Sequence, residues 1–175
     1  MLLKLPNNKF DIIYKIIEEC FPEVEYRPYQ QQKDLLLKEN YHIYTIEKSI
    51  KGFIAFWEFS NFVYVEHLAI RVNYQGQKLG SKILKELKTL TKKTIILEVE
   101  LPTNSIAKRR VKFYEKNGLF LNDYDYTMPA LTKSKSALPL AIMSSQRKLT
   151  EDEFIDVKQQ LYTLVYNKKP GSNIT

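Results

Sequence analysis

Cysteine and histidine are scarce in this sequence. Its 175 residues include 1 cysteine, Cys20, and 2 histidines, His42 and His67. One cysteine excludes an internal disulfide and is compatible with a reducing cytoplasm, which is the compartment that we expect. Two imidazoles and one thiol without a recognisable ligand spacing predict that no metal is bound. We interpret Cys20, which ends a segment with helical apolar periodicity, as a small buried hydrophobic residue.

Long hydrophobic runs and glycine-rich motifs are also absent. No apolar run approaches the roughly 20 residues of a membrane span, and the first residues lack the profile of a signal peptide, so we expect no membrane partner. Among only 5 glycines, there is no G-x-G-x-x-G, no G-x-x-x-x-G-K-[ST] and no G-x-S-x-G. These absences exclude the dinucleotide fingerprint, the phosphate loop of NTPases and the nucleophile elbow of hydrolases.

The composition itself is that of an ordinary globular protein. Apolar residues make up 44% and charged residues 27% of the chain, and we expect one domain spanning residues 1–175. The net charge of +7 favours an anionic partner. Because the lysines are spread along the chain, without zinc-finger spacing or a basic zipper, nucleic acid is a minor alternative and we expect no such partner. The groups at Lys78, Lys82 and 108–110 are better placed to meet a phosphate-rich ligand.

One stretch organises the chain as a strand, a glycine turn and a helix. Residues 63–70 are apolar and β-branched enough for a mostly buried strand. Gly76 and Gly80 bracket the turn, and apolar residues recur at helical spacing from Ser81 onward. The backbone N–H groups at such a helix start favour phosphate. The alternative is a strand–helix connection that merely needs two glycines.

The flanking segments predict an α+β protein with a largely antiparallel sheet. An amphipathic helix ends at Pro22, and a capping box at Thr150 opens a last helix. Gly118 is a good C-terminal cap for a helix that begins at Ser105. The remaining expected elements are a helix at 29–38, a hairpin of strands 41–47 and 53–59 with a turn at 49–52, strands 94–100 and 138–143, an aromatic loop at 122–130, a C-terminal helix at about 150–167 and a loose tail at 168–175.

Two motifs in this order resemble a known family. The run from Glu66 to Ile70, followed by 74–81, looks like the acetyl-CoA-binding segment of the GNAT superfamily of N-acyltransferases, whose pattern is Arg/Gln-x-x-Gly-x-Gly/Ala. Gln75 and Gly80 match its ends, and Lys78 stands where the family usually has its middle glycine. Residues 110–119 resemble the second signature, of the Phe-Tyr-Glu-Lys-x-Gly-Phe type. Together the two motifs span residues 63–120, about a third of the chain.

The resemblance implies a GNAT-type mixed, mostly antiparallel sheet of about six to seven strands, flanked by helices and split near the cofactor site. It implies acetyl-CoA as the acyl donor, with the backbone of 75–81 on the pyrophosphate and that of 68–70 along the pantetheine arm. Ala107 stands where the family often has an asparagine, and Asn104 or Arg110 are candidates to replace it. The cofactor-binding residues implied are Leu68, Ala69, Ile70, Gln75, Gly76, Gln77, Lys78, Leu79, Gly80, Ser81 and Tyr114.

The chemistry of acyl transfer from a thioester to an amine needs an acid for the leaving thiolate and a neutral amine. By resemblance, Tyr114 is the candidate acid, because a phenol is protonated at neutral pH. Glu66 is the candidate base, acting through a water, or a group that orients a cationic acceptor. Strand alternation places Glu66 on the face of Leu68 and His67 on the opposite face, where we expect a structural role.

Three carboxylates are expected near the acceptor. Glu98 and Glu100 are rivals of Glu66, and together with Tyr126 they are the candidate substrate-binding residues. The expected function is therefore transfer of an acetyl group from acetyl-CoA to a primary amine of a cationic small molecule or peptide, by direct attack in a ternary complex. The alternative is a non-catalytic CoA-binding sensor or partner module, and a homodimer is left open.

Overall fold

The computed structural model describes residues 1–46 and 50–168. The chain divides into two compact units, residues 1–96 and 97–175, and each is described by itself. The single domain expected from the sequence stays a prediction. Glu47 and Ser49 of the predicted hairpin, and residues 169–175 of the predicted tail, lie outside the described residues.

The first unit is built on an antiparallel meander of four strands. These are β1 (Leu2–Lys4), β2 (Tyr41–Ile46), β3 (Gly52–Glu58) and β4 (Phe62–Ile70), and each pairs with the next in chain order. The predicted hairpin and the strand that follows it are confirmed. The register shifts between Ala55 and Phe56, which pair with His67 and Val65. Glu66 is therefore the extra residue of a β-bulge in β4.

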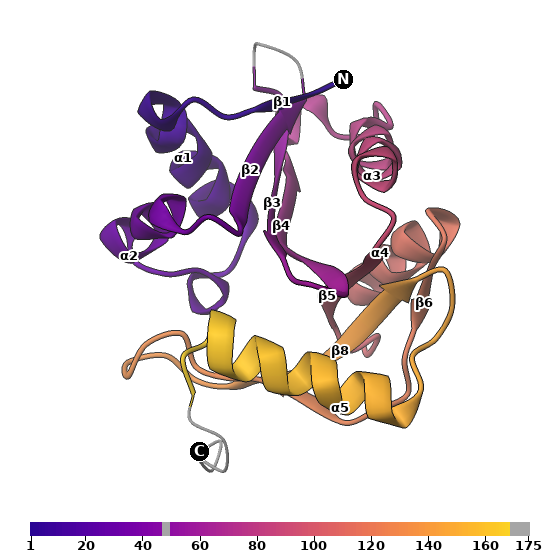
Figure 1. The fold of residues 1–175 in the computed structure, drawn as a ribbon. Coiled ribbons are helices and arrows are strands. Elements are labelled where there is room, and N and C mark those ends of the chain that lie inside the picture. Colours follow the sequence, from indigo (N-terminus) through magenta and orange to yellow (C-terminus); the bar gives the residue numbers. More distant parts are fainter. Residues whose placement is uncertain (47–49, 169–175) are drawn as a thin grey trace. The chain divides into compact units, whose positions relative to one another are not determined.

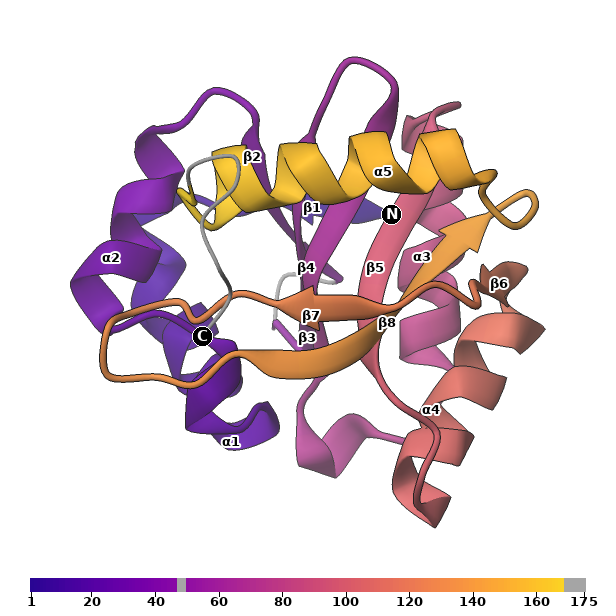
Figure 2. The ribbon, with the colours of Figure 1, turned by 90° about the horizontal axis from the view of Figure 1, so that it is seen from below.

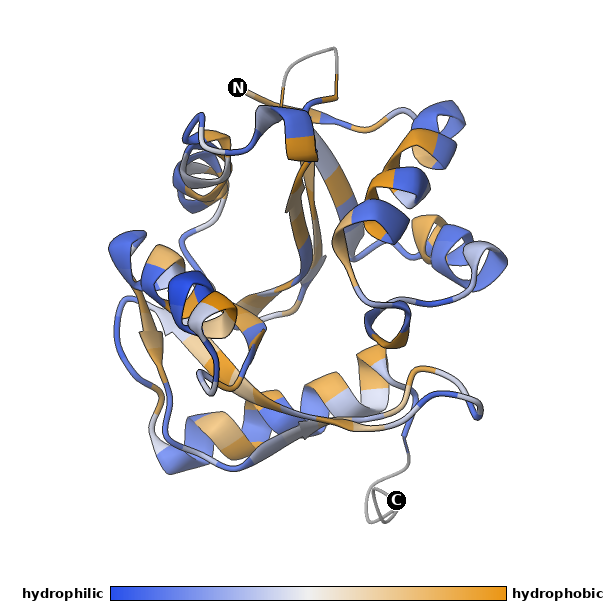
Figure 3. Ribbon diagram, turned by 180° about the vertical axis from the view of Figure 1, so that it is seen from behind, coloured by the Kyte–Doolittle hydropathy of each residue, from blue (hydrophilic) through white to orange (hydrophobic). Residues whose placement is uncertain are grey.

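Helices lie on both faces of this meander. Figure 1 shows α1 (Phe10–Cys20) and α2 (Tyr29–Asp34) on one side of the strands and α3 (Leu79–Leu90) on the other. Short 3-10 turns occupy Asn7–Lys9, Glu23–Glu25, Leu35–Leu37 and Val72–Tyr74. Because β3 is covered on both faces, every residue except Glu58 is buried, and the strand reads as a continuous apolar run. Figure 3 shows the same contrast between largely hydrophobic strands and two-sided helices.

The second unit is a smaller α+β arrangement. Strand β5 (Thr94–Glu100) begins in the first unit and ends here, and is followed by α4 (Ser105–Lys116), β6 (Leu119–Leu121), β7 (Tyr126–Met128), β8 (Leu138–Ser145) and α5 (Glu151–Gln160). Strand β8 pairs antiparallel with β6 near its end and with β7 near its start, as Figure 2 shows. The segment 122–130, predicted to be a loop, therefore contains a strand, which is too short for its alternation to be read from the sequence.

Local caps fix the helix ends of this unit. The Asn104 side chain accepts hydrogen bonds of 2.9 Å from the N–H groups of Ile106 and Ala107, and so begins α4. Gly118 follows the helix with φ of 73°, as predicted. The Thr150–Glu153 capping box is confirmed at the start of α5. The predicted helix at 150–167 is α-helical to Gln160 and continues as a π-helix over Leu161–Val165.

The fold class expected from the sequence is confirmed. The paired strands for which a register is given are all antiparallel, and helices flank them in both units. The described residues form eight strands instead of six to seven, because β1, β6 and β7 have only three residues each. Of the helices that the structure describes, none combines the length and the hydrophobicity needed to span a bilayer.

Candidate functional site

The turn between β4 and α3 has two left-handed residues. Gly76 has φ of 77° and Lys78 has φ of 59°. A Cβ atom added to Gly76 would meet nothing within 4 Å, so this glycine serves the backbone conformation and not a close approach. Lys78 adopts the αL region despite its side chain, at a cost of about 1–2 kcal/mol. Lys78 stands where the family pattern usually has its middle glycine. Its left-handed backbone explains why glycine is usual at this position.

The start of α3 presents backbone donors. The first bond into the helix runs from the N–H of Lys82 to the carbonyl of Lys78 at 3.0 Å. Helix geometry leaves the N–H groups of 79–81 without an intrahelical acceptor, and no side chain caps the helix. Lys78 and Lys82 are exposed beside them. Amides, helix dipole and two ammonium groups together suit a diphosphate.

Hydrogen bonds tie the end of β4 to this turn and to the residue before β3. The Gln75 side chain donates to the Ile70 carbonyl at 3.1 Å, and the N–H of Arg71 donates to the Lys51 carbonyl at 3.0 Å. Leu68 and Ile70 are half-buried and Ala69 is buried. The strand and turn predicted to hold the cofactor are thus one connected piece of the first unit. Their contact with the cofactor stays a prediction.

Glu66, the candidate base, is held by partners that the sequence did not reveal. Arg27 donates to its Oε1 at 2.5 Å and Gln32 to its Oε2 at 3.3 Å. The side chains of Arg27 and Glu66 are only 8% and 6% exposed. Burial alone would raise the pKa of Glu66, but the Arg27 charge and these hydrogen bonds outweigh burial, so the pKa is lowered and the group is ionised at neutral pH.

The bulge changes the geometry expected for His67. Regular alternation predicts that His67 and Glu66 lie on opposite faces, but Glu66 Oε2 is 3.6 Å from His67 Nδ1. That prediction is wrong because the extra residue interrupts the alternation. The His67 ring is 2% exposed, packs against Phe21 at 4.7 Å, and donates through Nε2 to the Glu25 carbonyl at 3.3 Å. Burial lowers the pKa of His67, so it is neutral at pH 7 and serves the structural role expected.

In the second unit, Glu98 and Tyr126, two of the candidate substrate-binding residues, are in contact. The Tyr126 hydroxyl donates to Glu98 Oε1, and the hydroxyl of Tyr166 donates to Oε2 at 2.7 Å. Tyr126 is 4% and Tyr166 7% exposed, while Glu98 is half-buried. Sequence reasoning missed Tyr166, because no local motif distinguishes it from the other tyrosines among the 12 in the chain.

The other candidates of this unit have partners of their own. Glu100 pairs with Arg110 at 2.8 Å, and Asn104 caps α4. Both candidates to replace the family asparagine at Ala107 thus have side-chain contacts, and that role stays a prediction for each. Tyr114 is half-buried on α4, with its ring edge-on to Phe113 at 5.1 Å. Because Tyr114 and Glu66 belong to different units, their approach to one thioester stays a prediction.

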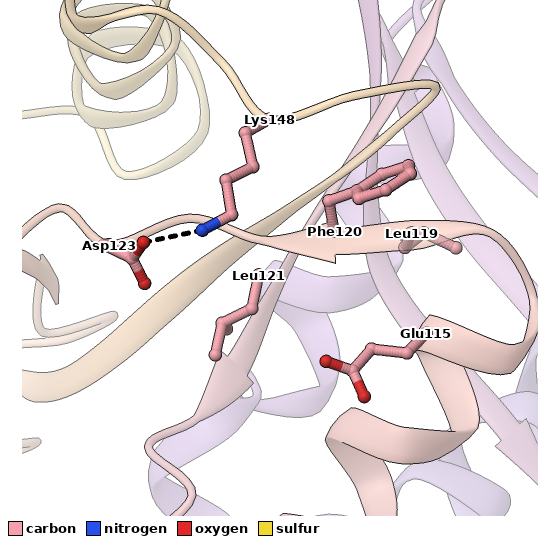
Figure 4. Close-up of a pocket in the computed structure, with 6 residues that line it drawn as sticks. All are labelled: Glu115, Leu119, Phe120, Leu121, Asp123 and Lys148. Carbon is pink, nitrogen blue, oxygen red and sulfur yellow. Dashed lines mark hydrogen bonds and ion pairs between the residues drawn. The ribbon is translucent and has the colours of Figure 1, made fainter.

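A surface pocket of about 430 Å³ lies elsewhere in the second unit. Figure 4 shows that Lys148 pairs with Asp123 at its rim, at 2.6 Å, while Phe120 and Leu121 contribute apolar surface. The remaining lining residues are Glu115 and Leu119, so the pocket includes no predicted site residue. Among the described residues, no three histidine, cysteine, aspartate or glutamate side chains gather as a metal site.

Comparison with known proteins gives a consistent result. Residues 10–119 match the model of the acetyltransferase (GNAT) family. "Putative acetyltransferase YjbC" of Bacillus subtilis (strain 168) is 26% identical over 159 residues, which cover 89% of this chain and 82% of that protein. A solved structure, "Putative acetyltransferase from GNAT family from Bacteroides thetaiotaomicron", has a TM-score of 0.90 and 28% identity, and the match covers 97% of this chain and 99% of that one.

A more distant structure supports the fold alone. The PaiA N-acetyltransferase of Thermoplasma acidophilum, solved in complex with coenzyme A, has a TM-score of 0.61 at 19% identity, and the match covers 84% of this chain and 98% of that one. The family match spans more than half of the chain and includes α1 to α4. The strand, turn and helix around Lys78 lie inside it. The chain therefore belongs to the GNAT family of acetyltransferases.

Proposed function

We propose that this protein transfers an acetyl group from acetyl-CoA to a primary amine of a cationic small molecule or peptide, by direct attack in a ternary complex. The observation that carries the proposal is the turn before α3, where two left-handed residues, Gly76 and Lys78, lead into amides without helix partners. A diphosphate is the anion that this geometry suits. The coenzyme A complex of the Thermoplasma acidophilum structure supports the choice of donor. We place the activity in the cytoplasm, in keeping with the single cysteine.

Each proposed residue has a defined task. The backbone of 75–81 holds the diphosphate, and the backbone of 68–70 aligns the pantetheine arm. Bound acetyl-CoA supplies the thioester that the amine attacks. Tyr114 donates a proton to the departing sulfur, and Glu66 accepts a proton from the amine through a water. Glu66 is ionised at neutral pH, which a proton acceptor requires.

The experiment measures thiol release from acetyl-CoA across a panel of amines, together with calorimetric titration of CoA. We expect turnover by the wild type and a loss of about 10²–10⁴-fold in kcat for Tyr114→Phe. The calorimetric titration shows whether this variant, which lacks the hydroxyl of a proposed cofactor-binding residue, still binds CoA. Tight CoA binding without turnover of any amine by the wild type would instead establish the non-catalytic CoA-binding module.

A further inference from the structure

Gln32, a buried residue of α2, is part of neither sequence motif. It is 0% exposed, and burying an amide is unfavourable unless its polar atoms find partners. The amide oxygen accepts a hydrogen bond from the backbone N–H of Arg27 at 3.3 Å. The amide nitrogen donates to the Tyr41 hydroxyl at 3.1 Å and to Oε2 of Glu66, the proposed base, at 3.3 Å. These bonds use the oxygen and both N–H groups, so the amide is anchored at each polar position.

The partners of the amide determine which way it faces. A backbone N–H can only donate, so the amide oxygen must face Arg27, and an ionised carboxylate can only accept, so the amide nitrogen must face Glu66. The Arg27 guanidinium donates to the other carboxylate oxygen, Oε1, at 2.5 Å. Both donors come from residues 27–32, where the N–H of Gln32 bonds to the Pro28 carbonyl at 3.0 Å. One short segment thus directs the carboxylate through both of its oxygens.

Three titratable side chains face Glu66. They are Arg27 before α2, Tyr41 on β2 and His67 on β4. Burial, followed by the Glu66 charge, raises the pKa of Tyr41 well above its usual value, and burial lowers the pKa of His67, so both are neutral at pH 7. Of these three, Arg27 alone carries a full charge, and Gln32 adds a second donor. Their combined effect lowers the pKa of Glu66 against the opposing influence of burial.

A general base must be deprotonated and aimed at the proton that it accepts. A carboxylate held through one oxygen can still rotate, whereas donors on both oxygens fix its plane. Each carboxylate oxygen has two lone pairs, so a carboxylate with two donors can still accept a proton. Resting on the proposed function, we infer that Gln32 is a positioning residue of the acetyl transfer, whose amide orients the Glu66 carboxylate and keeps it in the deprotonated form that accepts the amine proton.

The first test follows the Glu66 carboxyl group itself by carbon-13 NMR of protein labelled at the glutamate carboxyl carbons. The signal that disappears in Glu66→Gln identifies Glu66, and its pH titration gives the midpoint. Gln32→Met removes the amide donor without adding a charge. We expect the midpoint to rise by about one pH unit, the effect of one hydrogen bond to a charged group.

A second variant and a control accompany this measurement. Gln32→Glu keeps the shape of the side chain and the acceptor for the Arg27 N–H, but replaces the donor by a like charge, so it raises the midpoint further. The matched control is Gln30→Met in the same helix, which removes an exposed amide that donates to Asp34 at 2.7 Å and leaves the Glu66 midpoint unchanged. Thermal melting shows that each variant is folded.

The second test is the pH dependence of acetylation with the best amine of the panel. The ratio of variant to wild-type kcat at each pH cancels the protonation of the amine, which is common to both enzymes. We expect this ratio to fall from pH 7 toward pH 5 for both Gln32 variants and to stay level for Gln30→Met, because the base is protonated at a higher pH without the amide donor. A purely structural role would lower the melting temperature and leave the ratio level.

The outcomes separate this inference from the proposed function. An unchanged Glu66 midpoint in the folded Gln32 variants, or a level kcat ratio between pH 7 and pH 5, overturns the inference alone. Absence of turnover with every amine by the wild type overturns the proposed function instead, and the NMR titration then still reports what Gln32 does to Glu66.

Discussion

The buried pair of Arg27 and Glu66 allows a quantitative test. Replacing Arg27 by methionine keeps the apolar stem and removes the charge, which leaves a carboxylate that is 6% exposed without its guanidinium. Breaking a buried ion pair from one side lowers the free energy of unfolding by about 3–5 kcal/mol. Glu66→Gln removes the carboxylate that pairs with Arg27 at 2.5 Å and is also expected to lower the free energy of unfolding. The double variant Arg27→Met/Glu66→Gln contains no buried charge at this place, so it recovers most of the loss.

The pH dependence gives this prediction a sign. In the wild type, the pKa of Glu66 is lowered from its ordinary value of 4.5. Its contribution to stability is therefore present above pH 4.5 and is lost as the pH falls through the lowered pKa. In Arg27→Met, burial is the dominant influence left, and burial raises the pKa. The variant then gains stability as the pH falls from 7 toward 5. The double variant lacks Glu66 but keeps His67, so it measures how much of the pH dependence comes from His67.

The measurement is urea unfolding at pH 7 and pH 5, followed by fluorescence. Trp57 is the only tryptophan and is 1% exposed, so its emission reports unfolding of the first unit. The matched control is Arg147→Met, which breaks an exposed pair with Glu153 at 2.7 Å and is expected to change stability little. A loss of less than about 1 kcal/mol in Arg27→Met, or a double variant no more stable than the worse single one, refutes the reasoning.

The same double variant also decides what Glu66 does in catalysis. If Glu66 accepts the proton as proposed, the double variant folds and binds CoA but stays far below wild-type kcat. If acetyl transfer returns together with stability, Glu66 serves only to hold Arg27. The comparison separates the two roles because glutamine at position 66 cannot accept the proton, while the double variant has no unpaired charge at positions 27 and 66.

Three further changes test local geometry by thermal or urea unfolding. Thr150→Ala removes the cap of α5 and lowers the free energy of unfolding by about 1 kcal/mol, whereas Thr150→Ser keeps it. Lys78→Gly places glycine at a left-handed position and raises the free energy of unfolding by about 0.5–1 kcal/mol. A lower free energy of unfolding in this variant would contradict the φ of 59°. Gly52→Ala puts a methyl group 2.7 Å from the Ala69 carbonyl oxygen and lowers stability by about 1–3 kcal/mol, and wild-type stability would show that β3 and β4 separate freely there.

Local sequence patterns were sufficient for most elements of the fold. The apolar periodicity of α1 and α3, the Thr150 capping box and the glycine after α4 each depend on residues within one or two helical turns. The same holds for the turn at 75–81, whose glycine and helix start are adjacent in the chain. The strands of three residues were missed because two or three side chains are too few to show an alternation. These strands form because they pair with longer strands that lie far away in the sequence.

The sequence by itself determined the fold class, the order of the main elements and, through two motifs, the family. Only the tertiary structure decided the state of the carboxylates. Arg27 lies 39 positions before Glu66, and Tyr166 lies 68 positions after Glu98, and no local pattern distinguishes these residues from the other arginines and tyrosines of the chain. The bulge at Glu66 depends on pairing between β3 and β4. Charge compensation acts through space, so which carboxylate is neutralised is a property of the folded chain.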